Sequence, residues 1–187
     1  MVDRGRIDHA LRVTVSRSQR AFLFPARHFA SDVRDPSVPP MGLRLRLRRS
    51  FPLGGFGPQA QTVLRALKRY GMIVADNGST GFISGAPSPA WDDDDLHALE
   101  RVPASAFEVV DVSRLPGTPS ARVVNARHTE AGGRHQVRFL HTAAGPVTIE
   151  TVVGRAVVGR LRRILRQGVA TISTPARPGA RYRLRLR

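Results

Sequence analysis

Leucine and arginine alternate along residues 43–48. Leu43, Leu45 and Leu47 occupy every second position, and an arginine follows each of them. Successive side chains of a β-strand point to opposite faces, so this pattern places the leucines on a buried face and the arginines in water. The segment predicts a half-buried strand, and a chain that contains it must fold around a sheet.

Further strands and one long helix are expected before residue 116. Val63, Leu64 and Leu67 fall on one face of a helix over about 59–70, and Gly71 stands where a helix C-cap belongs. Short apolar segments with turn residues around them predict strands at 13–15, 21–25, 72–75 and 107–112.

Two polar runs predict a turn and a second helix. Asp76-Asn77-Gly78-Ser79 is typical of a tight hairpin, because Asn-Gly accepts positive φ angles, and Phe82 would open the return strand. The run from Asp92 to Asp95 would cap a short helix over about 93–101, since carboxylates stabilise a helix N-terminus.

After Pro116 the chain becomes a series of short strands with glycine and proline between them. Residues 155–166 suit an amphipathic helix better, because Val157, Val158, Leu161, Ile164 and Leu165 recur at helical spacing. The closing Pro178-Gly179-Ala180-Arg181-Tyr182 resembles the last strand of bacterial immunoglobulin-like accessory domains. The strands are expected at 123–126, 136–141, 147–153, 169–173 and 182–186.

We therefore expect an α+β fold: an antiparallel sheet with one main helix (about 59–70) and a short one (about 93–101), followed by a small mainly-β module. The charge also changes near Pro116. Residues 51–115 have 5 basic and 8 acidic side chains, whereas residues 116–187 have 14 and 2. We predict a first domain over 1–115 and an Arg-rich, immunoglobulin-like β module over 116–187.

The formal net charge of +16 would attract any polyanion. Lys68 is the only lysine among 30 basic residues. Such use of arginine, with abundant Ala, Gly, Pro and Val, is typical of a GC-rich genome. The basic segment has almost no interleaved aromatic residue, which disfavours specific reading of nucleic-acid bases.

Composition also excludes several kinds of site. There is no cysteine, so the chain has neither disulfides nor a thiolate metal site. No apolar run approaches the roughly 20 residues that a membrane helix needs. The first thirty residues contain charges throughout, and we expect no signal peptide among them. No metal site and no cofactor are expected.

Six ordered blocks in the first 110 residues or so are similar to a known protein family. They include Pro25-Ala26-Arg27-His28, Pro39-Pro40-Met41-Gly42 and Tyr70-Gly71-Met72, the last followed by Ala75-Asp76-Asn77-Gly78-Ser79. The chain resembles the C-terminal half of an uncharacterised family of large secreted proteins, common in actinobacteria and related soil bacteria. The resemblance implies an extracellular location and a polysaccharide-related role, and it names no reaction.

The chain departs from this family in two places. The family has a further stretch of comparable length before the block Ile7-Asp8-His9-Ala10-Leu11, where this chain begins. An aromatic residue is usual in the turn before Phe82, where this chain has Thr80-Gly81. A site built between the two halves of the family domain would be incomplete here.

Three residues are candidates for catalysis. His28 could transfer protons near neutral pH. Asp76, with Asp92 or Asp93 as the second member, could form the pair of carboxylates that glycoside hydrolysis needs. Each residue has a structural alternative. His28 could bond to nearby backbone, Asp76 could belong only to an Asp-Asn-Gly turn, and Asp92 could cap a helix.

Seven further residues are candidates for binding. Arg27 and Asn77 adjoin the catalytic candidates, and Trp91, the sole tryptophan, could stack on a sugar ring or anchor a core. Arg160, Arg162, Arg163 and Arg166 would cluster on one helix and bind a polyanion.

Three functions follow from these observations. The first is an extracellular or cell-envelope protein that binds or processes polysaccharide. The second is a non-specific polyanion binder that acts through the basic C-terminal module on nucleic acid or an acidic cell-wall polymer. The third is a non-functional fragment of a longer gene.

Overall fold

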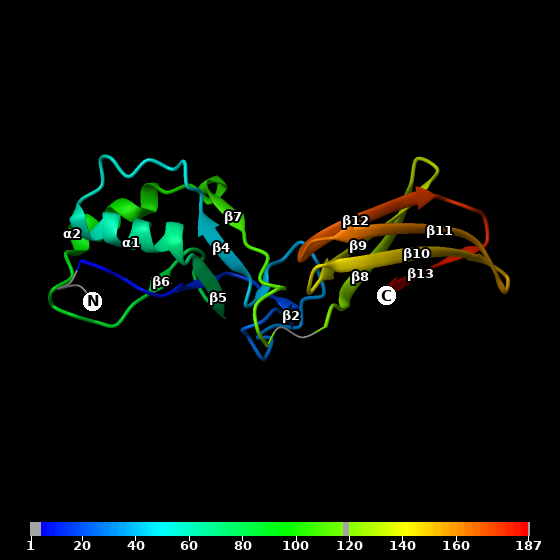
Figure 1. The fold of residues 1–187 in the computed structure, drawn as a ribbon, viewed down its shortest axis with the longest axis horizontal. Coiled ribbons are helices and arrows are strands. Elements are labelled where there is room, and N and C mark those ends of the chain that lie inside the picture. The colour runs from blue at the N-terminus through cyan, green and yellow to red at the C-terminus, as the bar shows by residue number, and fades with distance from the viewer. Residues whose placement is uncertain (1–4, 118–119, 187) are drawn as a thin grey trace. The chain divides into compact units, whose positions relative to one another are not determined.

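The computed structural model describes residues 5–117 and 120–186, which are rich in β-strands and include two α-helices (Figure 1). Its contacts divide the chain into two compact units. The helical unit comprises the residues up to Ser16 together with Gly42–Val110. The sandwich unit comprises Arg17–Met41 together with the chain from Asp111 onward.

This division differs from a single cut near Pro116. The segment Arg17–Met41 belongs to the sandwich unit, where β2 (Gln19–Phe22) pairs with β3 (Pro40–Met41). The amide of Asn125 donates to Gln19 Oε1 over 2.7 Å and so joins β2 to the C-terminal part of the chain. Such contacts between distant segments leave no local pattern in the sequence.

The helical unit is built on a five-stranded sheet in the order β6-β1-β5-β4-β7. The expectation of an antiparallel sheet is wrong for one pair, because β1 and β5 run parallel. A parallel pair needs a long connection, and the chain between Val15 and Met72 supplies it. The strands are β1 (Leu11–Val15), β4 (Arg44–Leu47), β5 (Met72–Asn77), β6 (Ile83–Ser84) and β7 (Phe107–Val109).

The half-buried strand predicted from the alternating leucines is confirmed as β4. Leu47 is fully buried, whereas Arg46 is exposed and forms an ion pair of 2.7 Å with Glu108 of β7. On the neighbouring strands Leu11 lies opposite Met72 and both are buried. These residues form the apolar face of the sheet.

The main helix is confirmed as α1 (Pro58–Arg69). It buries one side against the sheet, including Val63, Leu64 and Leu67 as expected. Gly71 follows its C-terminus with φ +72° and donates its N–H to Ala66 O. The short helix is α2 (Asp93–His97), continued by 3₁₀ turns at Ala98–Arg101 and Ala104–Ala106.

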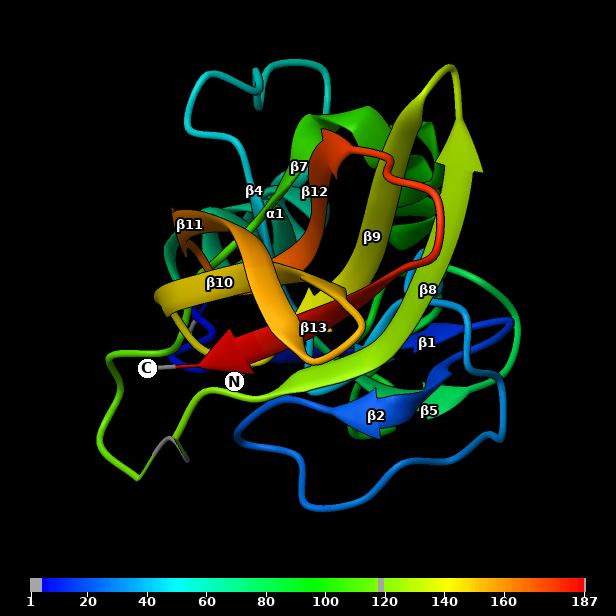
Figure 2. The same ribbon diagram turned by 90° about the vertical axis from the view of Figure 1, so that its right-hand side faces the viewer.

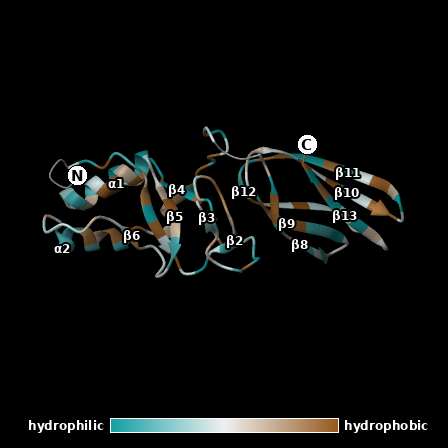
Figure 3. Cartoon of the chain, turned by 90° about the horizontal axis from the view of Figure 1, so that it is seen from below, coloured by the Kyte–Doolittle hydropathy of each residue, from teal (hydrophilic) through white to brown (hydrophobic). Residues whose placement is uncertain are grey.

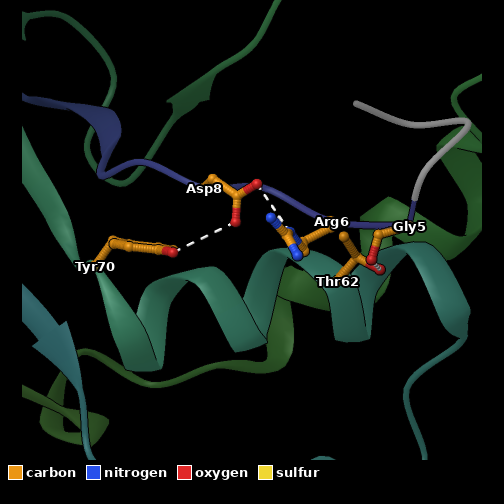
Figure 4. Close-up of polar contacts among 5 residues, drawn as sticks. All are labelled: Gly5, Arg6, Asp8, Thr62 and Tyr70. Atoms are coloured by element: carbon orange, nitrogen blue, oxygen red, sulfur yellow. Dashed lines mark hydrogen bonds and ion pairs between the residues drawn. The ribbon is translucent and has the colours of Figure 1, made fainter.

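Polar contacts hold the N-terminal segment against α1 (Figure 4). The Thr62 hydroxyl donates to Gly5 O over 3.2 Å, and the Tyr70 hydroxyl donates to Asp8 Oδ1 over 3.4 Å. Asp8 also accepts from Arg6 Nε over 2.8 Å, and this hydrogen bond lowers the pKa of Asp8.

The turn after β5 and the return strand β6 are present as expected, but the predicted hairpin pairing around Asp76–Ser79 is wrong. β6 pairs antiparallel with β1 and not with β5, so the chain crosses to the far side of β1. The turn is fastened to the end of β1 by bonds from Gly78 N to Val15 O and from Gly81 N to Thr14 O. The residue with positive φ in this connection is Gly81. The expected residues, Asn77 and Gly78, do not have positive φ.

The sandwich unit contains two three-stranded antiparallel sheets, β12-β9-β8 and β11-β10-β13 (Figures 1 and 2). Val137, Phe139 and Ile172 of the first sheet pack with Val147 and Ile149 of the second. The mainly-β module is therefore a two-sheet sandwich. Its strands are β8 (Val123–Ala131), β9 (Arg134–His141), β10 (Gly145–Val153), β11 (Ala156–Leu165), β12 (Gly168–Pro175) and β13 (Ala180–Leu186).

The predicted amphipathic helix over 155–166 is wrong, since this segment is β11. The turn Gly154-Arg155 joins β10 to β11, and Gly154 has the positive φ (+59°) that a tight hairpin needs at its first central position. Leu161 then lies opposite the buried Ile149. Pairing with β10 decides the structure of a segment whose apolar spacing is compatible with a helix.

No helix among the described residues is long and apolar enough to span a membrane.

Candidate functional site

Five arginines share the outer face of the β11-β10-β13 sheet. Residues opposite each other in antiparallel strands point to the same face. Glu150 lies opposite Arg160 on one side and Arg183 on the other. The next rows add Arg162 and Arg185, both opposite Thr148, and Arg181, opposite Val152. We call this set the arginine face: Arg160, Arg162, Arg181, Arg183 and Arg185.

The opposite face of the same sheet is apolar. Ile149 lies between Leu161 and Leu184, and all three belong to the sandwich core. The alternation of hydrophilic and hydrophobic residues along these strands is visible in Figure 3. One sheet therefore uses one face for packing and presents a concentrated positive charge on the other.

Glu150 is the single carboxylate at the centre of the arginine face. Its side chain is only 3% exposed and accepts from Arg185 Nε over 2.7 Å and from Arg160 Nε over 3.1 Å. These two hydrogen bonds lower the pKa of Glu150, with that to Arg185 the largest cause. The carboxylate fixes two of the five guanidinium groups in place.

Three arginines of the face have no carboxylate partner among the described residues, and one of them, Arg181, bonds to a backbone carbonyl instead. Among the described residues, no carboxylate lies within ion-pair distance of Arg162 or Arg183. Arg181 donates to Gly154 O over 3.2 Å. Arg162 and Arg183 are therefore the guanidinium groups most available to an external anion.

The spacing of these charges suits an extended ligand. Alternate residues of a strand lie about 6.8 Å apart, and neighbouring strands lie about 4.8 Å apart. Guanidinium groups bind carboxylate, sulfate or phosphate oxygens through paired N–H donors. The face is thus a regular two-dimensional array of guanidinium donors, repeated along and across the strands.

Aromatic side chains do not contribute to this array in the described residues. Tyr182, the only aromatic residue of β10, β11 and β13, points into the sandwich and stacks on His135 with ring centroids 3.5 Å apart. Stacking of nucleic-acid bases on aromatic rings is therefore not available on the face.

The predicted polyanion residues are divided by the strand geometry. Arg160 and Arg162 lie on the arginine face, but the helix expected to group them is β11. Arg163 is the next residue after Arg162 and points to the other face, where it donates to the Arg162 carbonyl over 3.0 Å. Arg166 follows the end of β11. The prediction missed Arg181, Arg183 and Arg185, although they alternate with apolar residues as residues 43–48 do.

Among the described residues, no hydrogen bond or ion pair joins the catalytic candidates to one another. His28 belongs to the sandwich unit and is exposed. Asp76 is exposed at the end of β5 and accepts from the N–H of Asn77 over 2.8 Å. Asp92 is the N-cap of α2 and accepts from the N–H of Asp95 over 3.1 Å. Asp76 thus accepts a hydrogen bond from the backbone near the end of its strand, and Asp92 caps a helix.

The other ligand-binding candidates are similarly dispersed. Arg27 is exposed in the sandwich unit. Trp91 is half-buried and its indole N–H donates to Ala86 O over 3.1 Å, whereas Asn77 is the last residue of β5. Within the described part of the chain, no three His, Asp or Glu side chains are grouped so as to hold a metal ion.

A hydrogen-bonded chain of side chains joins β8 to β9. His135 Nδ1 lies 3.2 Å from Glu130 Oε1, and its Nε2 lies 3.0 Å from His128 Nδ1. Burial, and then the charge of His135, lower the pKa of His128. The position of His128 beside His135 thus favours the neutral form of His128 in the folded chain.

Each unit also has an open polar cavity of about 370 Å³. In the helical unit Arg46, Arg49, Lys68 and Arg69 line it, but Lys68 Nζ already donates to the carbonyl oxygens of Arg49 and Phe51. In the sandwich unit the cavity lies over the β12-β9-β8 sheet, where Asp35 forms an ion pair with Arg127. Internal partners thus occupy donors of Lys68 in the first cavity and neutralise the charge of Arg127 in the second.

No family model matches the chain, and no curated protein matches it.

Proposed function

We propose that the chain is an extracellular binding protein for an acidic polymer, and that the arginine face is the binding surface. The observation that supports this most directly is five arginines around one carboxylate on a regular sheet face. Glu150 neutralises one of the five positive charges, which leaves a net charge of +4 on the face. Arg162 and Arg183 are unpaired within the described residues.

Acidic polysaccharide is the favoured polymer. The face has repeated charges but no aromatic side chain on which a nucleic-acid base could stack. A uronate or sulfate at each sugar repeat needs only guanidinium donors. The resemblance to secreted, polysaccharide-related proteins agrees with this choice and also underlies the proposed location.

We further propose that the sandwich unit is an immunoglobulin-like module. In that fold the strands A, B and E share one sheet, and C′, C and F share the other. The orders β8-β9-β12 and β11-β10-β13 correspond to these sets in chain order. A tyrosine near the start of strand F typically bonds back to upstream backbone, and Tyr182 of β13 accepts from Arg177 N over 3.0 Å.

A binding titration of the whole chain tests the proposed function. The probes are polyuronate, heparin and a single-stranded oligonucleotide, each at several salt concentrations. The double variant Arg162→Gln/Arg183→Gln should bind polyuronate on the order of tenfold more weakly at low salt and should show a shallower salt dependence, because two charge contacts are lost.

A matched control loses the same charge elsewhere. Arg12→Gln/Arg65→Gln removes two exposed arginines of the helical unit and should bind like the parent chain. Equal weakening in both double variants would mean that net charge alone drives binding and would reject the arginine face. Tighter binding of the oligonucleotide than of both polysaccharides would reject the choice of polymer.

A further inference from the structure

The strand β13 has one open edge. Its register with β10 runs without a bulge from Val153↔Ala180 to Val147↔Leu186. Among the described residues, no strand pairs with its other side. Half of its backbone N–H and C=O groups therefore face away from the sheet, where they can pair with another extended chain.

The other edge strands are less suited to strand addition. The pairings of β11 with β10 and of β8 with β9 each contain a register shift, and such bulges twist an edge away from further pairing. β12 is regular but has no charged residue and ends at Pro175. β13 combines a regular backbone with side chains that can select a partner.

Those side chains specify the chemistry of the partner. On the core side, Tyr182 and Leu184 are half-buried and Leu186 is 36% exposed, so the core remains open along this edge. On the outer side Arg183 and Arg185 alternate with them. Residues directly opposite in paired strands lie about 4.5–5.5 Å apart. An added strand would therefore place apolar residues beside the leucines and acidic residues beside the arginines.

A second copy of this chain is a poor partner. An antiparallel pair of two β13 strands would bring arginines of one copy beside arginines of the other, and like charges across a strand pair are destabilising. The same arginines that discourage self-pairing attract an acidic strand.

We propose that the open edge of β13 binds an extended peptide segment in which apolar and acidic residues alternate, by completing the sheet β11-β10-β13 with a fourth strand. In the immunoglobulin-like fold, strand F lies between strands C and G, and an added strand would occupy the position of strand G. Donor-strand complementation is an established mode of recognition for exposed sheet edges. The main contacts of such a complex are backbone hydrogen bonds at the edge of β13, which polymer binding by the arginine face does not use.

The test uses the whole chain and a seven-residue fluorescent peptide that alternates valine and glutamate, matched to the seven residues of β13. Fluorescence anisotropy should show saturable binding. N-methylation of one alternate set of peptide nitrogens should weaken binding at least tenfold, whereas methylation of the other set should change it less than about twofold. The asymmetry arises because only every second N–H of an edge strand faces its neighbour.

A charge reversal tests the selectivity. Arg183→Glu should weaken binding of the valine–glutamate peptide several-fold and strengthen binding of a valine–lysine peptide, with Arg65→Glu as the control of equal charge change. If both methylated peptides bind equally well, the peptide is held by charge alone and strand addition is wrong. Absence of any binding also overturns the proposal, and neither result affects the polymer titration.

Discussion

The Asp95 carboxylate caps a helix to which it does not belong. Its Oδ2 atom accepts from the backbone N–H of Gln59 over 2.8 Å and from that of Ala60 over 3.3 Å, at the start of α1. Gly57, the N-cap residue of α1, has no side chain for this purpose. A Cβ at Gly57 would stand 2.4 Å from Asp95 Oδ1, so the glycine makes room for the cap.

Replacement of Asp95 by alanine should destabilise the helical unit by about 1 kcal/mol, the usual cost of losing an N-cap. Urea unfolding followed by circular dichroism measures the effect. Asp94→Ala, which removes the same charge from α2, should cost less, since Asp94 has no bond to α1 among the described contacts. Equal losses would show that the negative charge matters and that the hydrogen bonds do not.

Gly71→Ala should destabilise the helical unit by at least about 2 kcal/mol. Positive φ alone costs an L-residue about 1–2 kcal/mol, and a Cβ here would also lie 2.2 Å from the carbonyl oxygen of Leu45. Gly81→Ala separates the two causes, because Gly81 has φ +87° but open space around its Cβ position. A loss for Gly71→Ala no greater than for Gly81→Ala would contradict the steric contribution. Thermal unfolding of both variants provides the comparison.

The sequence could predict what depends on neighbours along the chain. The helical spacing of apolar residues predicts α1, and the ability of Gly71 to take a positive φ predicts where that helix ends. The strict alternation of leucine and arginine predicts β4. The sequence of β11 predicts a helix because Leu161, Ile164 and Leu165 recur at helical spacing. Only the pairing with β10 decides between a helix and a strand. The arginine face needs the register of three strands, which places Glu150 beside Arg185 across 35 residues of chain. Local patterns contain no information about that register.

Glu150→Gln should destabilise the sandwich unit at pH 7, with a smaller loss at low pH. The folded chain lowers the pKa of Glu150 from its ordinary value of 4.5. The carboxylate thus contributes stability above about pH 4.5, and this contribution disappears as the pH falls through the lowered pKa. Urea unfolding at pH 7 and pH 3 measures the difference. Glu108→Gln, which removes a partly exposed ion pair with Arg46, serves as the control and should cost less at pH 7.

The stability of the sandwich unit should also fall as the pH drops below 6.5. Burial lowers the pKa of His128 and of His141 from 6.5, so their neutral forms are favoured in the folded state. Their stabilising effect is fully present above pH 6.5 and is lost as the pH falls toward the lowered pKa values.

His128→Asn should reduce this pH dependence without abolishing it, because His141 remains. His97→Asn, in the helical unit, should leave the profile of the sandwich unit unchanged; a profile unaltered by His128→Asn would contradict the role of the His128–His135 pair.

The chain has two tyrosines, one in each unit, and they offer a matched comparison. The Tyr182 hydroxyl accepts from Arg177 N over 3.0 Å and holds the connection between β12 and β13, whereas the Tyr70 hydroxyl donates over 3.4 Å to the exposed carboxylate of Asp8. Tyr182→Phe should therefore cost about 1 kcal/mol of unfolding free energy, and Tyr70→Phe close to nothing. The phenylalanine ring keeps the stacking on His135, so the loss reports the hydroxyl alone. Equal stability of Tyr182→Phe and the parent chain would mean that this bond does not stabilise the sandwich, and it would remove one of the two features that support the immunoglobulin-like assignment.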